Sequence, residues 1–190
     1  MPVRSDAAVR REIVAFLGAL CLFLSAVEYL IPKPLPFLRL GLANLPLLLG
    51  LGFLRPADLA AVLLLKVLGQ GLVNGTLASY VFLFSFAGSA ASLAAMTVMA
   101  RLGRRRVSLV GVSLSGALAS ALVQLALSLA FVFGASARPI APLSLGSALA
   151  AGLLMGIFAE RFSRTSQWLA ALETRYRGAF RQSGDVGDAG

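Results

Sequence analysis

Six long apolar stretches, separated by short polar loops, constrain the fold of this chain more than any other feature. Hydrophobic residues make up 58% of the composition and charged residues 13%, and the mean hydropathy is +0.87. A helix of about 20 apolar residues crosses a ~30 Å hydrocarbon core. The pattern therefore predicts an all-α membrane protein with six transmembrane helices, over residues 13–31, 40–54, 57–76, 79–100, 107–133 and 140–160.

The second stretch is less regular than the others. Pro46, Gly50 and Gly52 interrupt it within a few residues. Backbone groups freed by such residues are tolerated inside a membrane only where protein or a cavity satisfies them. We therefore expect a tilted or partly unwound helix at this place.

The distribution of lysine and arginine predicts the orientation. If the N-terminus lies inside, thirteen arginines fall on cytoplasmic segments, and only Lys33, Arg39 and Arg138 lie outside. Because lysine and arginine accumulate in cytoplasmic loops, both termini are predicted to be cytoplasmic, in a bacterial inner membrane. The same bias accounts for the net charge of +9, so a nucleic-acid partner is not expected.

The predicted organisation has four parts. Residues 1–12 form a cytoplasmic N-terminus and residues 13–160 one six-helix bundle. Residues 161–182 are predicted to form a basic amphipathic helix on the lipids of the inner leaflet, with Trp168 as an interface anchor, and residues 183–190 a disordered tail. The apolar positions of that helix recur at helical spacing, at Phe162, Leu169, Leu172, Tyr176 and Phe180.

Polar residues inside the spans are the candidates for function, since ionisable and amide groups are costly in lipid. Lys66, Gln70 and Asn74 share one face of the third span and run from the midplane to the outer surface. Glu28 lies in the outer half of the first span, within reach of Lys66 if the two helices are neighbours. We expect these groups to line one outward-facing cavity for a small molecule. The full predicted binding set is Glu28, Arg39, Asn44, Lys66, Gln70, Asn74 and Gln124.

Structural roles for the same residues remain open at this point. A Glu28–Lys66 pair neutralises two buried charges without any ligand, and Glu28 alone is also compatible with a position among the lipid headgroups. Gln70, Asn74 and Gln124 are also typical interhelical hydrogen-bonding residues.

Signatures of catalysis and of metal binding are missing from the sequence. It has no histidine, a single cysteine, Cys21, and no G-x-x-x-x-G-K-[ST] loop for ATP. No two acidic residues are spaced like a magnesium site for diphosphates. We therefore expect no catalytic residues, no metal and no cofactor, and any use of ATP requires separate subunits.

Several short segments match a known pattern. They are Glu28-Tyr29-Leu30-Ile31-Pro32, Leu40-Gly41-Leu42-Ala43-Asn44-Leu45-Pro46, Phe84-Ser85-Phe86-Ala87-Gly88-Ser89, and Gly111-Val112-Ser113 followed by Gly116-Ala117 and Gln124. Over residues 13–160 the chain resembles the Gx transporter family, also labelled heptaprenyl diphosphate synthase component I. It is similar in size and span number to the substrate-binding S components of energy-coupling factor transporters.

The resemblance implies a six-helix bundle with both termini inside that captures a substrate near its outer face. It also implies docking of the first helix on a transmembrane coupling subunit driven by ATPases. Ala15 and Ala19 resemble the small-residue docking motif of that helix. One departure stands in the fifth span, where Ser120-Ala121 replaces a His-Asn pair that often precedes the glutamine in that family.

Three functional hypotheses follow. The first is a substrate-binding subunit for uptake of a small, partly apolar molecule with a separate ATPase module. The second is a non-catalytic membrane partner of a prenyl diphosphate synthase or quinone pathway enzyme. The third is an autonomous carrier that uses Glu28 and Lys66.

Overall fold

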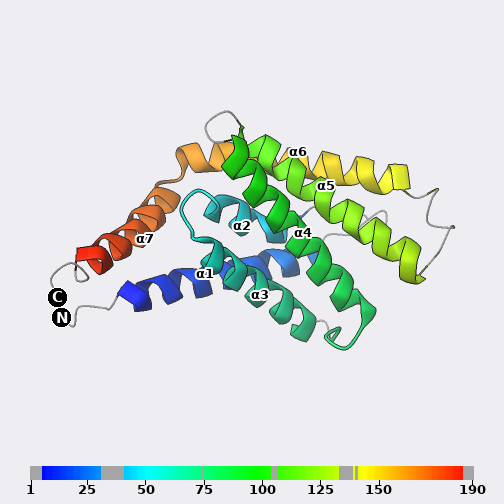
Figure 1. The fold of residues 1–190 in the computed structure, drawn as a ribbon, viewed down its shortest axis with the longest axis horizontal. Coiled ribbons are helices and arrows are strands. Elements are labelled where there is room, and N and C mark those ends of the chain that lie inside the picture. Colours follow the sequence, from blue (N-terminus) through cyan, green and yellow to red (C-terminus); the bar gives the residue numbers. More distant parts are fainter. Residues whose placement is uncertain are drawn as a thin grey trace.

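The computed structural model describes residues 6–30, 41–73, 75–103, 107–132, 139 and 141–185. These residues form an all-helical bundle without strands (Figure 1). The elements are α1 (Asp6–Leu30), the 3-10 turn η1 (Leu42–Asn44), α2 (Leu45–Gly50), α3 (Pro56–Val73), α4 (Tyr80–Gly103), α5 (Leu109–Leu127) with its π-helical extension η2 (Ser128–Val132), α6 (Ala141–Thr165) and α7 (Gln167–Asp185). The predicted all-α class is confirmed.

Four helices in the described part of the chain are long and apolar enough to cross a membrane. They are α3, α4, the continuous segment Leu109–Phe131 and α6. The multi-pass character inferred from hydropathy is therefore supported by helix length and composition. α1 has 25 residues but carries Arg10, Arg11 and Glu12 near its start and Glu28 near its end.

The predicted second span is a broken segment rather than a long helix. Gly41 adopts a left-handed backbone (φ 76°), and η1 and the six-residue α2 follow. Pro46 stands in the first turn of α2, where a missing N–H is tolerated. Six residues extend only about 9 Å along a helix axis. All six are buried, so this segment lies inside the bundle with its polar backbone enclosed by protein.

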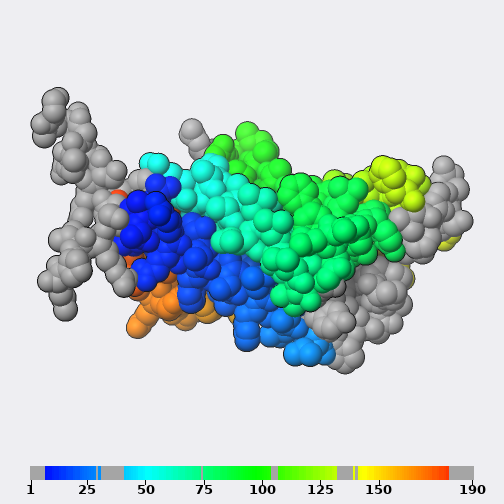
Figure 2. All heavy atoms as spheres, turned by 90° about the horizontal axis from the view of Figure 1, so that it is seen from below, coloured from blue at the N-terminus to red at the C-terminus, as the bar shows by residue number. Residues whose placement is uncertain are grey.

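The helices pack as two groups. α5 has its most extensive contacts with α4 and α6, and α1 has its most extensive contacts with α3, followed equally by α7 and η1. Figure 2 shows α1, α3 and α4 side by side on one face. Glycines bring α4, α5 and α6 close together: a Cβ at Gly116 would lie 2.6 Å from Met96 Cγ, and one at Gly156 2.6 Å from Val110 Cα. Small residues at crossings allow this approach.

α7 packs against the N-terminal half of α1, as its position beside α1 in Figure 1 shows. Leu169, Tyr176 and Ala179 of α7 are buried. Tyr176 packs in the core cluster that contains Ile13 and Leu17 of α1, and Leu169 packs in the cluster that contains Met96 and Val112. The apolar face that the sequence pattern assigned to the inner leaflet therefore packs largely on protein. α6 continues to Thr165, beyond the predicted end of the sixth span, and α7 continues to Asp185, into the segment predicted to be disordered.

Candidate substrate-binding cavity

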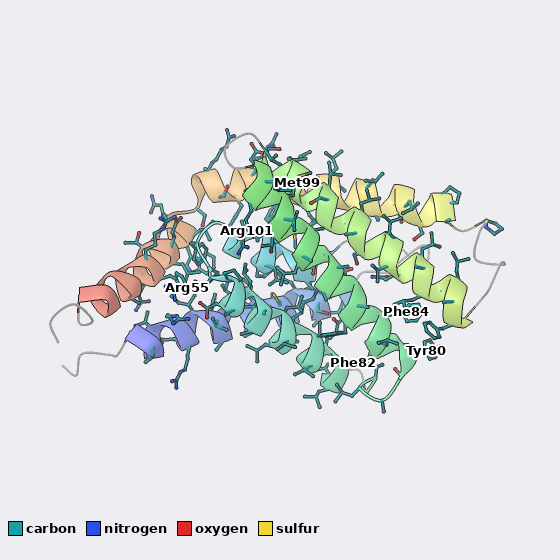
Figure 3. All side chains as sticks on the ribbon, in the orientation of Figure 1. Arg55, Tyr80, Phe82, Phe84, Met99 and Arg101 are labelled. Atoms are coloured by element: carbon teal, nitrogen blue, oxygen red, sulfur yellow. The ribbon has the colours of Figure 1, made fainter. Side chains whose placement is uncertain are left out.

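A cavity of about 980 Å³ lies between the two helix groups. Leu30 at the end of α1, Val73 at the end of α3 and Val81 at the start of α4 line it, so it occupies one end of the bundle. Arg55 and Arg101 lie toward the opposite end of the helices from Tyr80, Phe82 and Phe84 (Figure 3). The cavity therefore lies at the end away from α7 and these arginines.

Lys66 is the central polar group of the cavity wall. Its side chain is buried at 4% exposure, and Nζ donates hydrogen bonds to Asn44 Oδ1 and to Ser89 Oγ, the latter at 3.2 Å. An ammonium removed from water is stable only when such acceptors replace its hydration. Three separate elements, α3, η1 and α4, thus meet at one charged atom.

Glu28, which is also buried, lies on the same wall. Its Oε1 accepts a hydrogen bond from the backbone N–H of Gly41 at 3.3 Å. Glycine suits this position because its φ of 76° is one that side-chain-bearing residues rarely adopt. Asn44 N donates to Gly41 O at 2.9 Å, which closes the turn. The Gly41–Asn44 segment therefore supplies a hydrogen-bonding group to each of the two buried charges.

The opposite wall carries amide and hydroxyl groups. Gln124 Nε2 donates to Ser120 Oγ at 3.0 Å, one turn earlier on α5. A Cβ added at Gly88 of α4 would lie 2.5 Å from that amide nitrogen, so a larger residue there would require the Gln124 side chain to shift. Gln70, half-buried on α3, faces the same space one turn beyond Lys66.

The cavity brings together five residues of the predicted binding set, and two lie outside the described residues. Arg39 and Asn74 are those two. The five lining residues are Glu28, Asn44, Lys66, Gln70 and Gln124. Ala15 and Ala19 lie on an exposed face of α1, and neither lines the cavity.

Buried serines are the lining residues that sequence reasoning did not assign to binding. Ser89 and Ser92 line the cavity from α4, and Ser113 lines it from α5 while donating to Gly152 O of α6 at 2.8 Å. Ser89 and Ser92 stand in a segment rich in glycine, alanine and serine, so the sequence does not distinguish their hydroxyls from those of packing residues, whereas Ser113 shares a helix face with Gln124. Within the described ranges, no three histidine, cysteine, aspartate or glutamate side chains come together as a metal site.

A second polar cluster lies at the other end of the bundle. Tyr176 Oη of α7 donates to Asp58 Oδ2 of α3 and accepts from the Arg55 backbone N–H at 3.2 Å. Arg10 Nη2 of α1 lies 3.1 and 3.2 Å from the two carboxylate oxygens of Asp58. The pKa of the Tyr176 hydroxyl is raised above its ordinary value of 10. Burial is the larger cause, and the hydrogen bond to Asp58 is the second. The cluster joins α1, α3 and α7.

Comparison with known proteins gives one family. The model of the family described as heptaprenyl diphosphate synthase component I matches residues 17–162, which include every described cavity-lining residue. No curated protein and no solved structure matches the chain. This is the family that the chain resembles in the sequence segments around Glu28 and Asn44. The chain therefore belongs to the heptaprenyl diphosphate synthase component I family.

Proposed function

We propose that the protein is a non-catalytic membrane subunit that binds a small, partly apolar molecule in the cavity and delivers it for uptake with a separate ATPase module. The observation that carries the proposal is the placement of a buried, hydrogen-bonded Lys66 in the wall of a cavity of about 980 Å³. Ionisable residues at membrane depth typically mark substrate pathways.

The lining suits a ligand with both polar and apolar parts. Small-molecule sites typically measure about 300–1,000 Å³ and combine apolar walls with a few polar groups. Leu22, Val67 and Met96 supply apolar surface, while Lys66 and Gln124 supply hydrogen-bonding groups. Phe82 is the one aromatic side chain among the described lining residues. The ligand is therefore expected to be held by aliphatic contact more than by ring stacking.

In this proposal the cavity faces outward. α1, the broken segment around α2, and the four long apolar helices make up the six membrane segments, with both termini in the cytoplasm. The arginine-rich end is then the inner end, in agreement with the positive-inside rule, and the cavity end is the outer one. The exposed Ala15 and Ala19 lie on α1 between the two ends, where a coupling subunit can contact them.

The transport proposal is tested by recovering partners from the native host. The tagged protein, solubilised in mild detergent, is expected to co-purify with a transmembrane coupling subunit and two ATPases, identified by mass spectrometry. An Ala15→Leu, Ala19→Leu variant should lose them, because added side chains prevent close helix approach. Ala150→Leu, at an exposed alanine of α6, is the matched control and should retain them.

The family description favours a second candidate, a membrane partner of a prenyl diphosphate synthase. In that arrangement the cavity holds an isoprenoid and the soluble partner does the chemistry. Recovery of a soluble prenyl synthase without any ATPase would replace the transport proposal with this one. Uptake by the purified protein alone in liposomes would instead favour an autonomous carrier.

A further inference from the structure

A continuous row of aromatic rings crosses the junction between α6 and α7. The Trp168 ring centroid lies 5.7 Å from that of Phe16 on α1 and 6.5 Å from that of Phe162 on α6. Phe162 in turn lies 5.8 Å from Phe158. Phe16, Phe158 and Trp168 retain 47%, 50% and 41% exposure, so their outer surfaces are not covered by the described parts of the protein.

These rings lie where a membrane-crossing helix ends. α6 is one of the four helices long and apolar enough to span a bilayer, and its last turns contain Phe162 and Arg164. Tryptophan prefers the boundary between headgroups and hydrocarbon, where one side of the ring meets water and the other meets lipid. We therefore expect the row at the level of the lipid headgroups, with Phe158 one turn deeper along α6 than Phe162.

Arginines accompany the rings. Arg161 is exposed and follows Phe158 by three residues, which places the two on neighbouring positions of the helix surface. Beside it is a hollow of about 310 Å³ lined by Val110, Ile157, Glu160, Arg161 and Arg164. Arg164 Nη2 pairs with Glu160 Oε1 at 2.6 Å, which offsets the carboxylate charge. Two guanidinium groups and one carboxylate leave the hollow with net positive charge.

We propose that this inner corner, defined as Phe16, Phe158, Arg161, Phe162 and Trp168 with the adjoining hollow, is a binding site for an anionic phospholipid. The phosphate lies at Arg161 in the hollow, and an acyl chain follows Phe158 and Phe162 toward the membrane centre. The apolar floor of the hollow, Val110 and Ile157, lies beside the charged groups, as a lipid headgroup and its first chain carbons require.

The arrangement favours a lipid over other occupants. A free phosphate uses only the hollow and leaves the row of rings without a role. Phe158 lies three residues before Arg161, toward the apolar middle of α6, where a lipid acyl chain is available and a soluble acidic peptide is not. The site is separate from the cavity around Lys66, so it stands whether or not the uptake proposal holds.

Trp168 makes a direct test available because it is the single tryptophan in the sequence. The full-length protein is placed in nanodiscs of phosphatidylcholine that contain an equal fraction of chain-brominated phosphatidylglycerol or chain-brominated phosphatidylcholine. Bromine quenches tryptophan only at short range. We expect quenching by the brominated anionic lipid to be about twofold stronger, because arginines enrich anionic lipid near the ring.

Variants separate the named site from general surface charge. Arg161→Gln should remove most of the difference between the two brominated lipids, Arg161→Lys should retain most of it, and Arg175→Gln on the exposed face of α7 should leave it unchanged. Equal quenching by both lipids in the wild type, or an unchanged difference in Arg161→Gln, would overturn the proposal. Loss of the difference on adding millimolar inorganic phosphate at constant ionic strength would assign the site to phosphate instead.

Discussion

Lys66 and Asn44 are joined by a hydrogen bond between Nζ and Oδ1 although they are 22 residues apart and belong to different elements. The contact holds the interrupted segment around α2 against the middle of α3. Since Gly41 of the same turn binds Glu28, the short Gly41–Asn44 segment positions both buried charges of the cavity wall. The interruption of the helix between Gly41 and Gly50 therefore brings polar backbone and an amide to these charges.

Loss of the Asn44 amide should destabilise the bundle. Asn44→Ala removes one acceptor from a buried ammonium, which costs about 1–3 kcal/mol of unfolding free energy. Ser147→Ala is the matched control, since Ser147 lines the cavity but its hydroxyl bonds only to its own helix, at Ser144 O. SDS titration in mixed micelles measures both. An Asn44→Ala variant as stable as the wild type would contradict the assigned role of this hydrogen bond.

Two glycines of α6 should respond differently to the same substitution. Gly156→Ala places a Cβ 2.6 Å from Val110 Cα, a backbone atom that cannot move alone, so α5 and α6 must separate. We expect a loss of about 1–3 kcal/mol. Nothing lies within 4 Å of a Cβ at Gly146, so Gly146→Ala should be neutral or stabilising by up to about 1 kcal/mol. Equal stability changes would show that the close helix crossing is absent.

The Tyr176 hydroxyl should stabilise the attachment of α7. Tyr176→Phe leaves Asp58 with one donor fewer and should lower the unfolding free energy by about 1–3 kcal/mol. Tyr80→Phe removes a hydroxyl from an exposed ring and should change it by less than about 0.5 kcal/mol. Thermal unfolding monitored by circular dichroism compares the two variants. Equal unfolding midpoints for Tyr176→Phe and Tyr80→Phe would contradict a stabilising role for the hydrogen bond between Tyr176 and Asp58.

The contribution of Tyr176 should also depend on pH. Its pKa is raised in the folded protein, so below about pH 10 both folded and unfolded states are protonated and the contribution is complete. As the pH rises above 10, the unfolded state loses its proton first and the contribution declines. The stability difference between wild type and Tyr176→Phe should therefore shrink above pH 10. A difference that grows there would contradict the direction of the shift.

Cysteine accessibility should distinguish the core from the cavity. Cys21, the single cysteine, is fully buried, and a maleimide should not modify it until the protein is unfolded in SDS. In a Cys21→Ser background, Ser25→Cys places a thiol one turn later on α1, at a residue that lines the cavity. That thiol should react with a small maleimide in the native protein. Protection of both positions would mean that the cavity is closed to solutes.

Hydropathy and local spacing accounted for most of the helices. The interruption by Pro46, Gly50 and Gly52 was readable because each of these residues has a local backbone effect. The position of Lys66 and Gln70 on one face followed from helical periodicity alone. These features depend on residues close in sequence, which is why they needed no tertiary information.

Long-range partners were beyond the reach of the sequence pattern. Asp58 and Tyr176 are 118 residues apart, and nothing local connects them. Ser89 stands in a span rich in small residues, so its role as an acceptor for Lys66 depends on how α3 and α4 meet. The amphipathic pattern around Tyr176 identified an apolar face on α7, but only the packing shows that α1 covers it.

The cavity around Lys66 is expected to hold a small molecule. The most direct measurement is the identification and quantification, by mass spectrometry, of small molecules released on denaturing the protein purified from its native host. We expect about one equivalent of a single compound from the wild type and from the surface variant Arg175→Gln. A folded Lys66→Met variant should retain less than a tenth of it, because a hydrogen bond to a charged group is worth about 1.5–3 kcal/mol, or roughly 10- to 150-fold in affinity. An equal yield of the compound from Lys66→Met and from the wild type would contradict a ligand held at Lys66. Release of no small molecule from the wild type would contradict it as well.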